Sequence, residues 1–330
     1  MAGRTLRFLS ARDVVQALPM ARAIGAMKSA FRQLSDGEAV APTRVHIEAR
    51  EPRGDALFMP SYMPAAGRMG LKIVTVYGGN AALGLPLIQA IVAVLDAATG
   101  TPVAILDGTS LTAIRTGAAS GAATDLLARR DAAVVAIFGA GPQARTQLEA
   151  VCVVRGIHEA RVCDPDAARA AAFAAEMATR LGIAVRAVRS AAEALAGADV
   201  VCTATTSSQP VFADAEVAPG THVNAIGSYK PHVREVPEET VRRALVVVDH
   251  RPAALAEAGD LLIPMQKGLI TEAHIHAELG EILAGRKAGR QAPGQVTLFK
   301  SVGVAVQDLA AACEALANAE RRGLGVELQL

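Results

Sequence analysis

The chain has 330 residues, a formal net charge of +1 and a pI near 7.8, and only 3% of its residues are aromatic. This length exceeds what one hydrophobic core usually holds, so we expect about two domains. The near-neutral charge and the lack of tryptophan argue against nucleic-acid binding, which needs a basic face and aromatic stacking platforms.

Sequence features that direct a protein to export or into a membrane are missing. The N-terminal segment MAGRTLRFLSARDVV has no continuous apolar stretch of the signal-peptide type. The longest apolar tract, 85–106, is interrupted by polar residues, glycine and proline, which excludes a membrane span. The four cysteines lie in apolar runs without Cys-x-x-Cys spacing, as expected for free thiols. We therefore expect a cytoplasmic protein that binds neither nucleic acid nor membrane.

The part of the chain before about residue 125 predicts a mixed or antiparallel sheet. Apolar and polar residues alternate over 43–48 and 71–76, and turns rich in proline and glycine join such stretches. The run 87–95, followed by Thr99-Gly100-Thr101-Pro102, predicts a hairpin in the same sheet.

The motif Gly139-x-Gly141-x-x-Ala144 follows a β-branched run, 134–138, and precedes a helical segment, 145–154. In such a fingerprint the first glycine allows a tight turn and the second lets the backbone approach a pyrophosphate. The small third residue permits close packing of helix on strand, and the N–H groups of the helix N-terminus bind phosphate. This context predicts dinucleotide binding and disfavours the alternative, a glycine-rich turn in another α/β unit.

Short apolar runs alternate with helical patterns from about residue 131 to 264, which predicts a doubly wound parallel sheet. The run 160–163 ends in Asp164, an acidic residue placed for the ribose hydroxyls about 20 residues after the motif. Ligands of such sheets bind at the carboxyl ends of the strands. The runs 199–205, 222–226 and 244–249 therefore direct a further set of residues toward the cofactor: Thr203, Thr205, Ile226, Gly227 and Ser228.

These patterns predict an α/β protein in which a Rossmann domain, 126–303, accompanies an α+β domain, 1–125. The segment 304–330 is mostly an alanine-rich helix. We expect this helix to pack back on the N-terminal domain, because the Rossmann sheet is already complete.

Three cations are candidates for binding an anionic substrate. Arg44 lies in PTRVHIE, Lys72 in MGLKIVTV and Arg115 in LTAIRTGAAS. The surroundings of Lys72 and Arg115 are otherwise apolar, where an unpaired charge is costly. Each cation alone could be a salt-bridged or snorkelling side chain. Three together with a nicotinamide site suit a carboxylate substrate, which arginine binds in a bidentate fork.

Other motifs give weaker evidence of function. His274-x-His276 has the spacing of metal ligands, but no cysteine or carboxylate cluster completes it, so we expect a surface turn and no metal. The chain has no Gly-x-Ser-x-Gly motif and no His–Cys pairing of a hydrolase.

With these residues placed, the chain resembles the ornithine cyclodeaminase/mu-crystallin family over nearly its whole length. The resemblance rests on motifs in the order RVHIE at Arg44, FMPSYM at Phe58, GLKIV around Lys72, LTAIRTGAASGAAT around Arg115, GAGPQAR at Gly139, TATTSSQPVF at Thr203, VNAIGSYKPHVREV around Asn224, VVVDH around Asp249 and TLFKSVGVAVQDLAAA at Thr297.

The resemblance implies a homodimer in which the N-terminal domain, completed by the C-terminal helix, binds the substrate and forms the dimer contact. It implies that Arg44, Lys72 and Arg115 hold the substrate carboxylate, with Arg115 also at the cofactor and Met59 at the substrate. It implies further that Gln143 and Ala144 belong to the phosphate loop, Asp164 contacts the ribose, and Ser301 and Val302 close over nicotinamide and substrate.

Two departures from the cyclodeaminases narrow the activity. Where they carry an aspartate after the glycine of the IGSY-like motif, this chain has Ser228, and where they carry a glutamate two positions before the methionine of the FMP-like motif it has Leu57. A serine hydroxyl has no pKa near neutrality and cannot replace a carboxylate base. Both departures favour the ketimine-reductase branch over cyclisation of ornithine.

The sequence thus predicts NAD(P)H-dependent reduction of a cyclic ketimine carboxylate, with Δ1-pyrroline-2-carboxylate giving proline and the piperidine homologue as a second substrate. Lys72 and Ser228 are the candidates for catalysis, and NAD(H) is favoured over NADP(H) because Asp164 would repel a 2′-phosphate. The alternatives are an ornithine or lysine cyclodeaminase, an amino-acid dehydrogenase, and a non-catalytic small-ligand binder that keeps the fold and the cofactor.

Overall fold

The computed structural model describes residues 5–330, and the chain divides into two compact units. One unit combines Met1–Arg115 with Val304–Leu330, and the other is Thr116–Gly303. Helix α3 (Gly108–Leu127) runs through the division, and the boundary expected near residue 125 lies close to the end of the same helix. The first four residues of the expected N-terminal domain lie outside the described residues.

The first unit contains a seven-stranded sheet in the order β15-β1-β6-β5-β4-β3-β2. The sheet is mixed, because β1 pairs in parallel with β6 whereas the other neighbours are antiparallel. The predicted mixed sheet and the hairpin, now β5–β6, are confirmed. The strands are β1 (Thr5–Leu9), β2 (Val45–Ala49), β3 (Gly54–Met63), β4 (Arg68–Val76), β5 (Ile88–Asp96), β6 (Pro102–Asp107) and β15 (Val326–Gln329).

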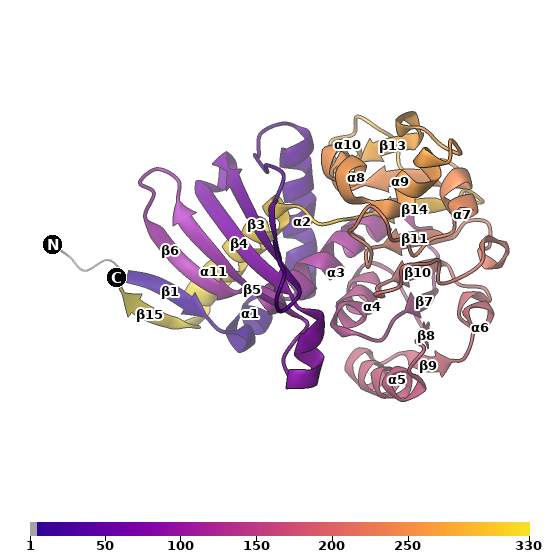
Figure 1. Cartoon of the computed structure of the whole chain (residues 1–330), viewed down its shortest axis with the longest axis horizontal. Helices are drawn as coiled ribbons and strands as arrows, with labels where there is room; N and C mark the ends of the chain where they lie inside the picture. Colours follow the sequence, from indigo (N-terminus) through magenta and orange to yellow (C-terminus); the bar gives the residue numbers. More distant parts are fainter. Residues whose placement is uncertain (1–4) are drawn as a thin grey trace. The chain divides into compact units, whose positions relative to one another are not determined.

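The sequence patterns did not predict β15, in which the end of the chain pairs with its beginning. Figure 1 shows this strand, in yellow, beside the indigo β1. A glycine with φ +64°, Gly323, ends the preceding helix α11 (Ala305–Arg322), a conformation that residues with a side chain rarely adopt. The chain is thereby turned so that 326–329 can extend along β1.

Helix α11 packs on one face of this sheet, against β3, β4 and β5, and also contacts α1 and α2. The approach is close at Gly70, where a Cβ atom would lie 2.8 Å from Leu309 Cδ1. Because α11 is rich in alanine, its backbone can come near the sheet. The expectation that the C-terminal helix packs on the N-terminal part is confirmed. The remaining helices of the unit are α1 (Ala11–Ala17), α2 (Met20–Ser35) and the short 3₁₀ turns η1 (Pro64–Ala66) and η2 (Gly78–Leu83).

The second unit contains eight parallel strands in the order β13-β12-β14-β11-β10-β7-β8-β9. The chain starts at β7, moves outward through β8 and β9, and then returns to β10 on the other side of β7, which makes the sheet doubly wound. This confirms the predicted Rossmann architecture. The strands are β7 (Val134–Phe138), β8 (Glu159–Cys163), β9 (Ala184–Val188), β10 (Val200–Thr203), β11 (His222–Ala225), β12 (Leu245–Val248), β13 (Ile275–Glu278) and β14 (Thr297–Lys300).

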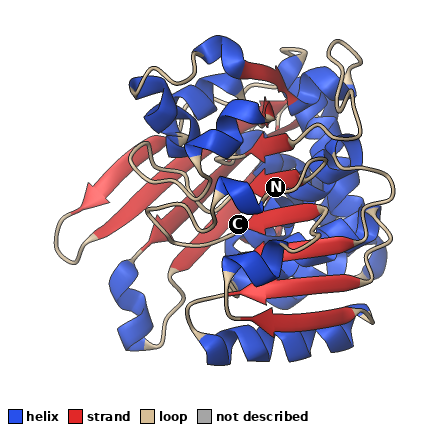
Figure 2. Cartoon of the chain, turned by 90° about the vertical axis from the view of Figure 1, so that its right-hand side faces the viewer, coloured by secondary structure: helices blue, strands red, loops and turns tan. Residues whose placement is uncertain are grey.

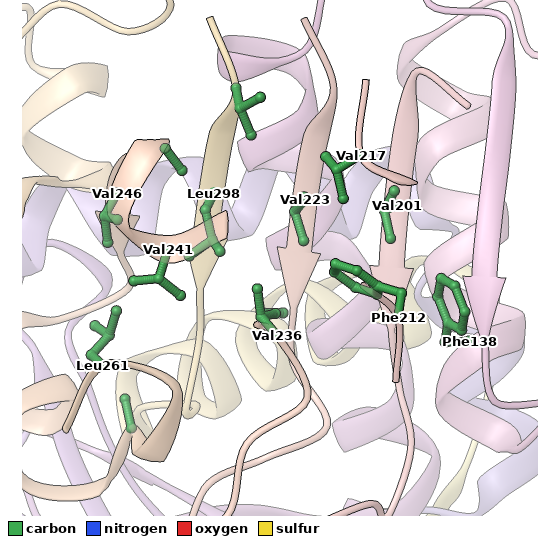
Figure 3. Packing of buried hydrophobic residues seen from close by; sticks show 14 of the residues in the cluster. Phe138, Val201, Phe212, Val217, Val223, Val236, Val241, Val246, Leu261 and Leu298 are labelled. Carbon is green, nitrogen blue, oxygen red and sulfur yellow. The ribbon is translucent and has the colours of Figure 1, made fainter. Parts of the chain in front are cut away.

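The strands of this sheet point in one direction, and helices lie on both of its faces (Figure 2). One hydrophobic cluster fills a face of the central strands (Figure 3). In it the rings of Phe138 and Phe212 lie 5.4 Å apart, and Val223 and Leu298 come from neighbouring strands. The helices are α4 (Pro142–Val154), α5 (Ala167–Leu181), α6 (Ala191–Leu195), α7 (Glu238–Arg243), α8 (Arg251–Glu257), α9 (Gly259–Gln266) and α10 (Leu279–Leu283), with the 3₁₀ turns η3 (Asp214–Glu216) and η4 (Glu272–His274).

The prediction of a surface turn at His274-x-His276 is confirmed for His274 and wrong for His276. His274 ends a 3₁₀ turn and His276 lies in strand β13. Their rings contact the backbone oxygens of Val241 and Ala288, respectively. Among residues 5–330 no cluster of three metal-binding side chains occurs. Within the same residues no helix has the length and apolar character that crossing a membrane requires.

Candidate active site

The glycine turn between β7 and α4 has the shape of a dinucleotide-binding loop. Gly139 has φ +93°, and a Cβ atom there would lie 2.6 Å from the carbonyl oxygen of Ala204, so only glycine fits. A Cβ atom at Gly141 would meet no chain atom within 4 Å. The fold therefore does not itself demand glycine at this second position, whereas a pyrophosphate lying against the backbone would.

The first turn of α4 also suits a bound nucleotide. Ala144 is fully buried, which allows the helix to pack closely on β7 and β10. The side-chain oxygen of Gln143 is buried and accepts no hydrogen bond from the described chain. Buried polar atoms of this kind are rare in folded proteins, so a ligand hydroxyl is a fitting partner. The loop residues thus fit a dinucleotide.

Asp164, directly after β8, braces this turn. Its Oδ2 accepts a hydrogen bond from the N–H of Ala140 at 2.8 Å, and its Oδ1 accepts from Arg169 Nη2 at 2.7 Å. Burial raises the pKa of Asp164, but the hydrogen bonds from Arg169 and the backbone outweigh burial and hold the pKa below its usual value. Asp164 is therefore ionised at neutral pH, with a half-exposed arginine beside it.

A buried carboxylate, Glu235, ties together the ends of β10 and β11. It accepts hydrogen bonds from the hydroxyl groups of Thr203 at 3.0 Å and Thr205 at 2.7 Å. It also accepts from the N–H groups of Gly227 at 2.7 Å and Ser228 at 3.1 Å. The two threonines predicted to face the cofactor thus lie at the expected edge of the sheet, but their hydroxyl protons are directed to Glu235.

Ser228 belongs to a second buried group, with Asp260 and Lys300. Its hydroxyl donates to Asp260 Oδ2 at 2.5 Å and accepts from Lys300 Nζ at 2.9 Å. Lys300 Nζ also lies 2.7 Å from Asp260 Oδ2. Burial raises the pKa of Asp260, whereas the charge of Lys300 lowers it, and the net pKa is below the usual value. The one proton of the Ser228 hydroxyl is donated to Asp260, so the catalytic role expected of Ser228 stays a prediction.

Asp249, which follows β12, holds the segment after β14. Its Oδ2 accepts hydrogen bonds from the Ser301 hydroxyl at 2.7 Å, the Val302 N–H at 2.9 Å and the Gly303 N–H at 2.8 Å. All the strands of this sheet are parallel, so Asp249 and Ser301 lie at the same edge as the glycine turn. The segment expected to cover the nicotinamide is thereby held in place.

The predicted cations of the first unit form a buried cluster around one carboxylate. Lys72 Nζ lies 2.8 Å from Asp308 Oδ2, and Arg115 Nε donates to Asp308 Oδ1 at 2.9 Å. Arg115 Nη1 donates to Gln307 Oε1 at 2.8 Å. Burial lowers the pKa of Lys72 to about 7, even though the charge of Asp308 opposes this effect. Lys72 can therefore hold or release a proton near neutral pH.

Two more predicted substrate residues lie close to Lys72. Met59 is buried on β3 and pairs with Lys72 across the β3–β4 ladder. Arg44, partly buried just before β2, is near enough for its charge to lower the Lys72 pKa further. Leu57 is buried two positions earlier on β3, where the cyclodeaminases carry a glutamate.

Five polar residues of these groups were not predicted from the sequence. Asp308 and Gln307 organise the cations, and Glu235, Asp260 and Lys300 organise the strand ends. Asp308, in VAVQDLAAA, and Lys300, in VTLFKSV, share one signal with Lys72 and Arg115, which is a charged residue within an apolar stretch. Applied to carboxylates as well as to cations, this signal would have found Asp308.

Comparison with known proteins agrees with this geometry. The model of the ornithine cyclodeaminase/mu-crystallin family matches residues 5–322. The chain belongs to this family. A Δ1-pyrroline-2-carboxylate reductase of Bacillus cereus is 38% identical over 322 residues, which cover 97% of this chain and 99% of that protein.

Two solved structures are similar to this chain in both sequence and fold. The Thermococcus litoralis Δ1-pyrroline-2-carboxylate reductase in complex with NADH and L-proline is 43% identical, with a TM-score of 0.94, over 97% of this chain and 99% of that one. An archaeal alanine dehydrogenase dimer with bound NAD is 35% identical, with a TM-score of 0.93, over 99% of this chain and 100% of that one.

Proposed function

We propose that this chain is an NAD(P)H-dependent reductase of cyclic ketimine carboxylates that converts Δ1-pyrroline-2-carboxylate to L-proline, with NAD(H) as the preferred cofactor. The observation that carries the proposal is the buried cluster in which two cations, Lys72 and Arg115, share the single carboxylate of Asp308. When Lys72 is protonated, these three side chains carry one unit of net positive charge. A substrate carboxylate would balance this charge. Relatives named for this reduction support the choice of substrate.

In this reaction, each residue of the cluster has a separate role. Bound NADH supplies the hydride that C2 of the imine receives. Arg115 and Arg44 bind the carboxylate and thereby orient C2, which is catalysis by proximity. Lys72 binds the same carboxylate and, with a pKa of about 7, can supply the proton that the imine nitrogen carries in the product amine. Imine, proton and hydride together give the saturated ring.

An assay separates this function from its rivals. The chain is expected to oxidise NADH with Δ1-pyrroline-2-carboxylate and with its six-membered homologue, Δ1-piperideine-2-carboxylate. Ornithine or lysine with NAD should release no ammonia, since Ser228 and Leu57 replace both cyclodeaminase carboxylates. NADH oxidation with pyruvate and ammonia, and none with either imine, would favour the alanine dehydrogenase reaction and overturn the proposal.

NADH is expected to give a higher kcat/KM than NADPH, because the ionised Asp164 repels a 2′-phosphate. Arg169 beside it weakens this repulsion. Arg169→Ala should therefore lower kcat/KM with NADPH about twofold to fivefold relative to NADH, the scale of an exposed ion pair. Arg180→Ala, a half-exposed arginine on the same helix α5, is the control. A preference for NADPH in the wild-type protein would contradict the assignment of Asp164.

We propose further that the chain forms a homodimer through the sheet of the first unit. Gly70 and Lys72 face α11. Side chains alternate along a strand, so Leu71 and every second residue from it along β4 face away from α11. This outward face is mostly apolar across the central strands, with Asp107 beside Ile91 and the pair Thr75–Gln89 as its polar border. Its rows, read from the strand pairing, are Phe58–Ile73–Ile91, Tyr62–Met69–Leu95 and Pro60–Leu71–Ala93–Ile105–Phe8.

A second copy of the chain suits this face, because large exposed apolar patches mark interaction sites and the related archaeal alanine dehydrogenase is described as a dimer. The wild-type protein is expected to sediment as a dimer. Ile91→Asp, at a residue 47% exposed on this face, should shift it to monomer. Val15→Asp, on helix α1, is the control at a similarly exposed residue. A wild-type monomer at micromolar concentration would contradict the proposal.

A cytoplasmic location is the last part of the proposal. All four cysteines are free, and burial raises the pKa of the Cys202 thiol to about 12. Thiols of this kind are inert and suit a reducing compartment. Fractionation of cells that express the protein at its natural level tests the location.

A further inference from the structure

Asp308 connects the two cations of the buried cluster in the first unit. It lies on α11, whereas Lys72 comes from β4 and Arg115 from α3. Both ion pairs are short, at 2.8 Å to Lys72 and 2.9 Å to Arg115. The side chains of Lys72 and Asp308 are each only 2% exposed, so water screens neither charge. A single carboxylate therefore sets the spacing between two cations from different elements.

Gln307, the preceding residue, completes the arrangement. Its Oε1 accepts hydrogen bonds from Arg115 Nη1 at 2.8 Å and from the Val304 N–H at 2.9 Å. The guanidinium is thus held at two points, by Asp308 through Nε and by Gln307 through Nη1. The side-chain nitrogen of Gln307 is buried and donates no hydrogen bond within the described chain. This nitrogen is a further donor that an anion in the cluster could satisfy.

We propose that Asp308 is a positioning residue of the reductase: it holds Lys72 and Arg115 side by side and keeps Lys72 charged, so that both can bind the substrate carboxylate. This inference rests on the proposed function. Two adjacent cations in an apolar interior repel each other, and the ammonium group gives up its proton more readily than the guanidinium. With Asp308 present, both charges persist up to the pKa of Lys72, and one of them remains for the substrate. The lysine also has three N–H donors, more than one carboxylate needs.

The decisive variant is Asp308→Asn, which keeps the size of the side chain and an oxygen acceptor but removes the charge. The charge of Asp308 raises the pKa of Lys72, so its loss should lower that pKa further. Carboxylate binding needs the charged lysine. The alkaline limb of kcat/KM should therefore move at least one pH unit lower, with at least a tenfold loss of kcat/KM at pH 8 that is partly recovered at pH 6.

Glu314→Gln on the same helix is the matched control, since its carboxylate pairs with Arg22 on the surface and not with the cluster. This variant should keep the wild-type pH profile. Thermal unfolding supplies a readout without activity. The Asp308–Lys72 attraction stabilises the fold below the pKa of Lys72 and is lost as the pH rises through it. The Tm gap between wild type and Asp308→Asn should therefore narrow between pH 6 and pH 9.

An unchanged pH profile and KM in Asp308→Asn, with a Tm gap that does not vary with pH, would overturn the inference and leave Asp308 a packing residue. Failure of the wild-type protein to reduce either imine would instead overturn the proposed function. In that case the pH dependence of the Tm gap alone decides whether Asp308 keeps Lys72 charged.

Discussion

Arg115→Lys is expected to lower kcat/KM for Δ1-pyrroline-2-carboxylate about tenfold to hundredfold, although the positive charge is kept. The guanidinium of Arg115 reaches Asp308 through Nε and Gln307 through Nη1, two acceptors that a planar fork can serve at once. An ammonium group carries its three donors on one nitrogen atom, so it cannot reach the two acceptors that Arg115 meets through separate nitrogens and also present a planar pair of donors to the substrate. The loss corresponds to roughly 1–3 kcal/mol of transition-state binding, the scale of a charge-assisted hydrogen bond.

Steady-state kinetics with the purified variant test this expectation. Arg68→Lys is the control, because Arg68 also pairs with an aspartate, Asp96, in the first unit but is partly exposed and outside the cation cluster. This control should retain wild-type kcat/KM, which would show that exchange of an ion-paired arginine for lysine in this unit is not harmful in itself. Near wild-type activity of Arg115→Lys would mean that Arg115 only balances Asp308, and the carboxylate-binding role would be wrong.

The sequence allowed the prediction of features that depend on neighbouring residues. The turn at Gly139 follows from a β-branched run, a residue without a side chain and a helix start, all within about one βα unit. Lys72 and Arg115 were recognisable because each interrupts an apolar stretch. In both cases the physical cause lies within a few residues of the signal.

Features that depend on distant parts of the chain could not be predicted in this way. Asp308 meets its partner Lys72 across 236 residues, and no local pattern records that contact. Strand β14 has only four residues, TLFK, yet it lies between β11 and β12 in the sheet. Its buried Lys300 is tolerated because Asp260 and Ser228, far from it in sequence, accept its hydrogen bonds. Tertiary contacts of this kind override local propensity.

Ser228→Asp restores the residue type that the cyclodeaminases carry at this position, and it is expected to cost about 3–5 kcal/mol of stability, the scale of an uncompensated buried charge. The Ser228 hydroxyl donates to Asp260 at 2.5 Å, so the introduced carboxylate would face another carboxylate. Glu235 accepts a hydrogen bond from the same residue's backbone, and Lys300 is the cation beside all of them. Three acidic groups would then share one lysine.

The pH dependence identifies the cause. Repulsion by Asp260 and burial raise the folded-state pKa of the introduced carboxyl group above its unfolded value, so its protonated form is favoured in the folded protein. The destabilisation is therefore full above the raised pKa and is relieved as the pH falls toward the unfolded value near 4. The Tm deficit of Ser228→Asp should be smaller at pH 5 than at pH 8. Ser228→Asn introduces a side chain of nearly the same volume as aspartate but without the charge. Its Tm deficit should be smaller and should not vary with pH.

The same variant tests the assignment of the reaction. Ser228→Asp should release no ammonia from ornithine with NAD, because Leu57 still stands where the cyclodeaminases carry their second carboxylate. Equal Tm deficits in Ser228→Asp and Ser228→Asn at both pH values would show that size and not charge is the obstacle. Ammonia release from ornithine by Ser228→Asp would show that one carboxylate suffices. The departure at position 57 would then carry no weight in separating reductases from cyclodeaminases.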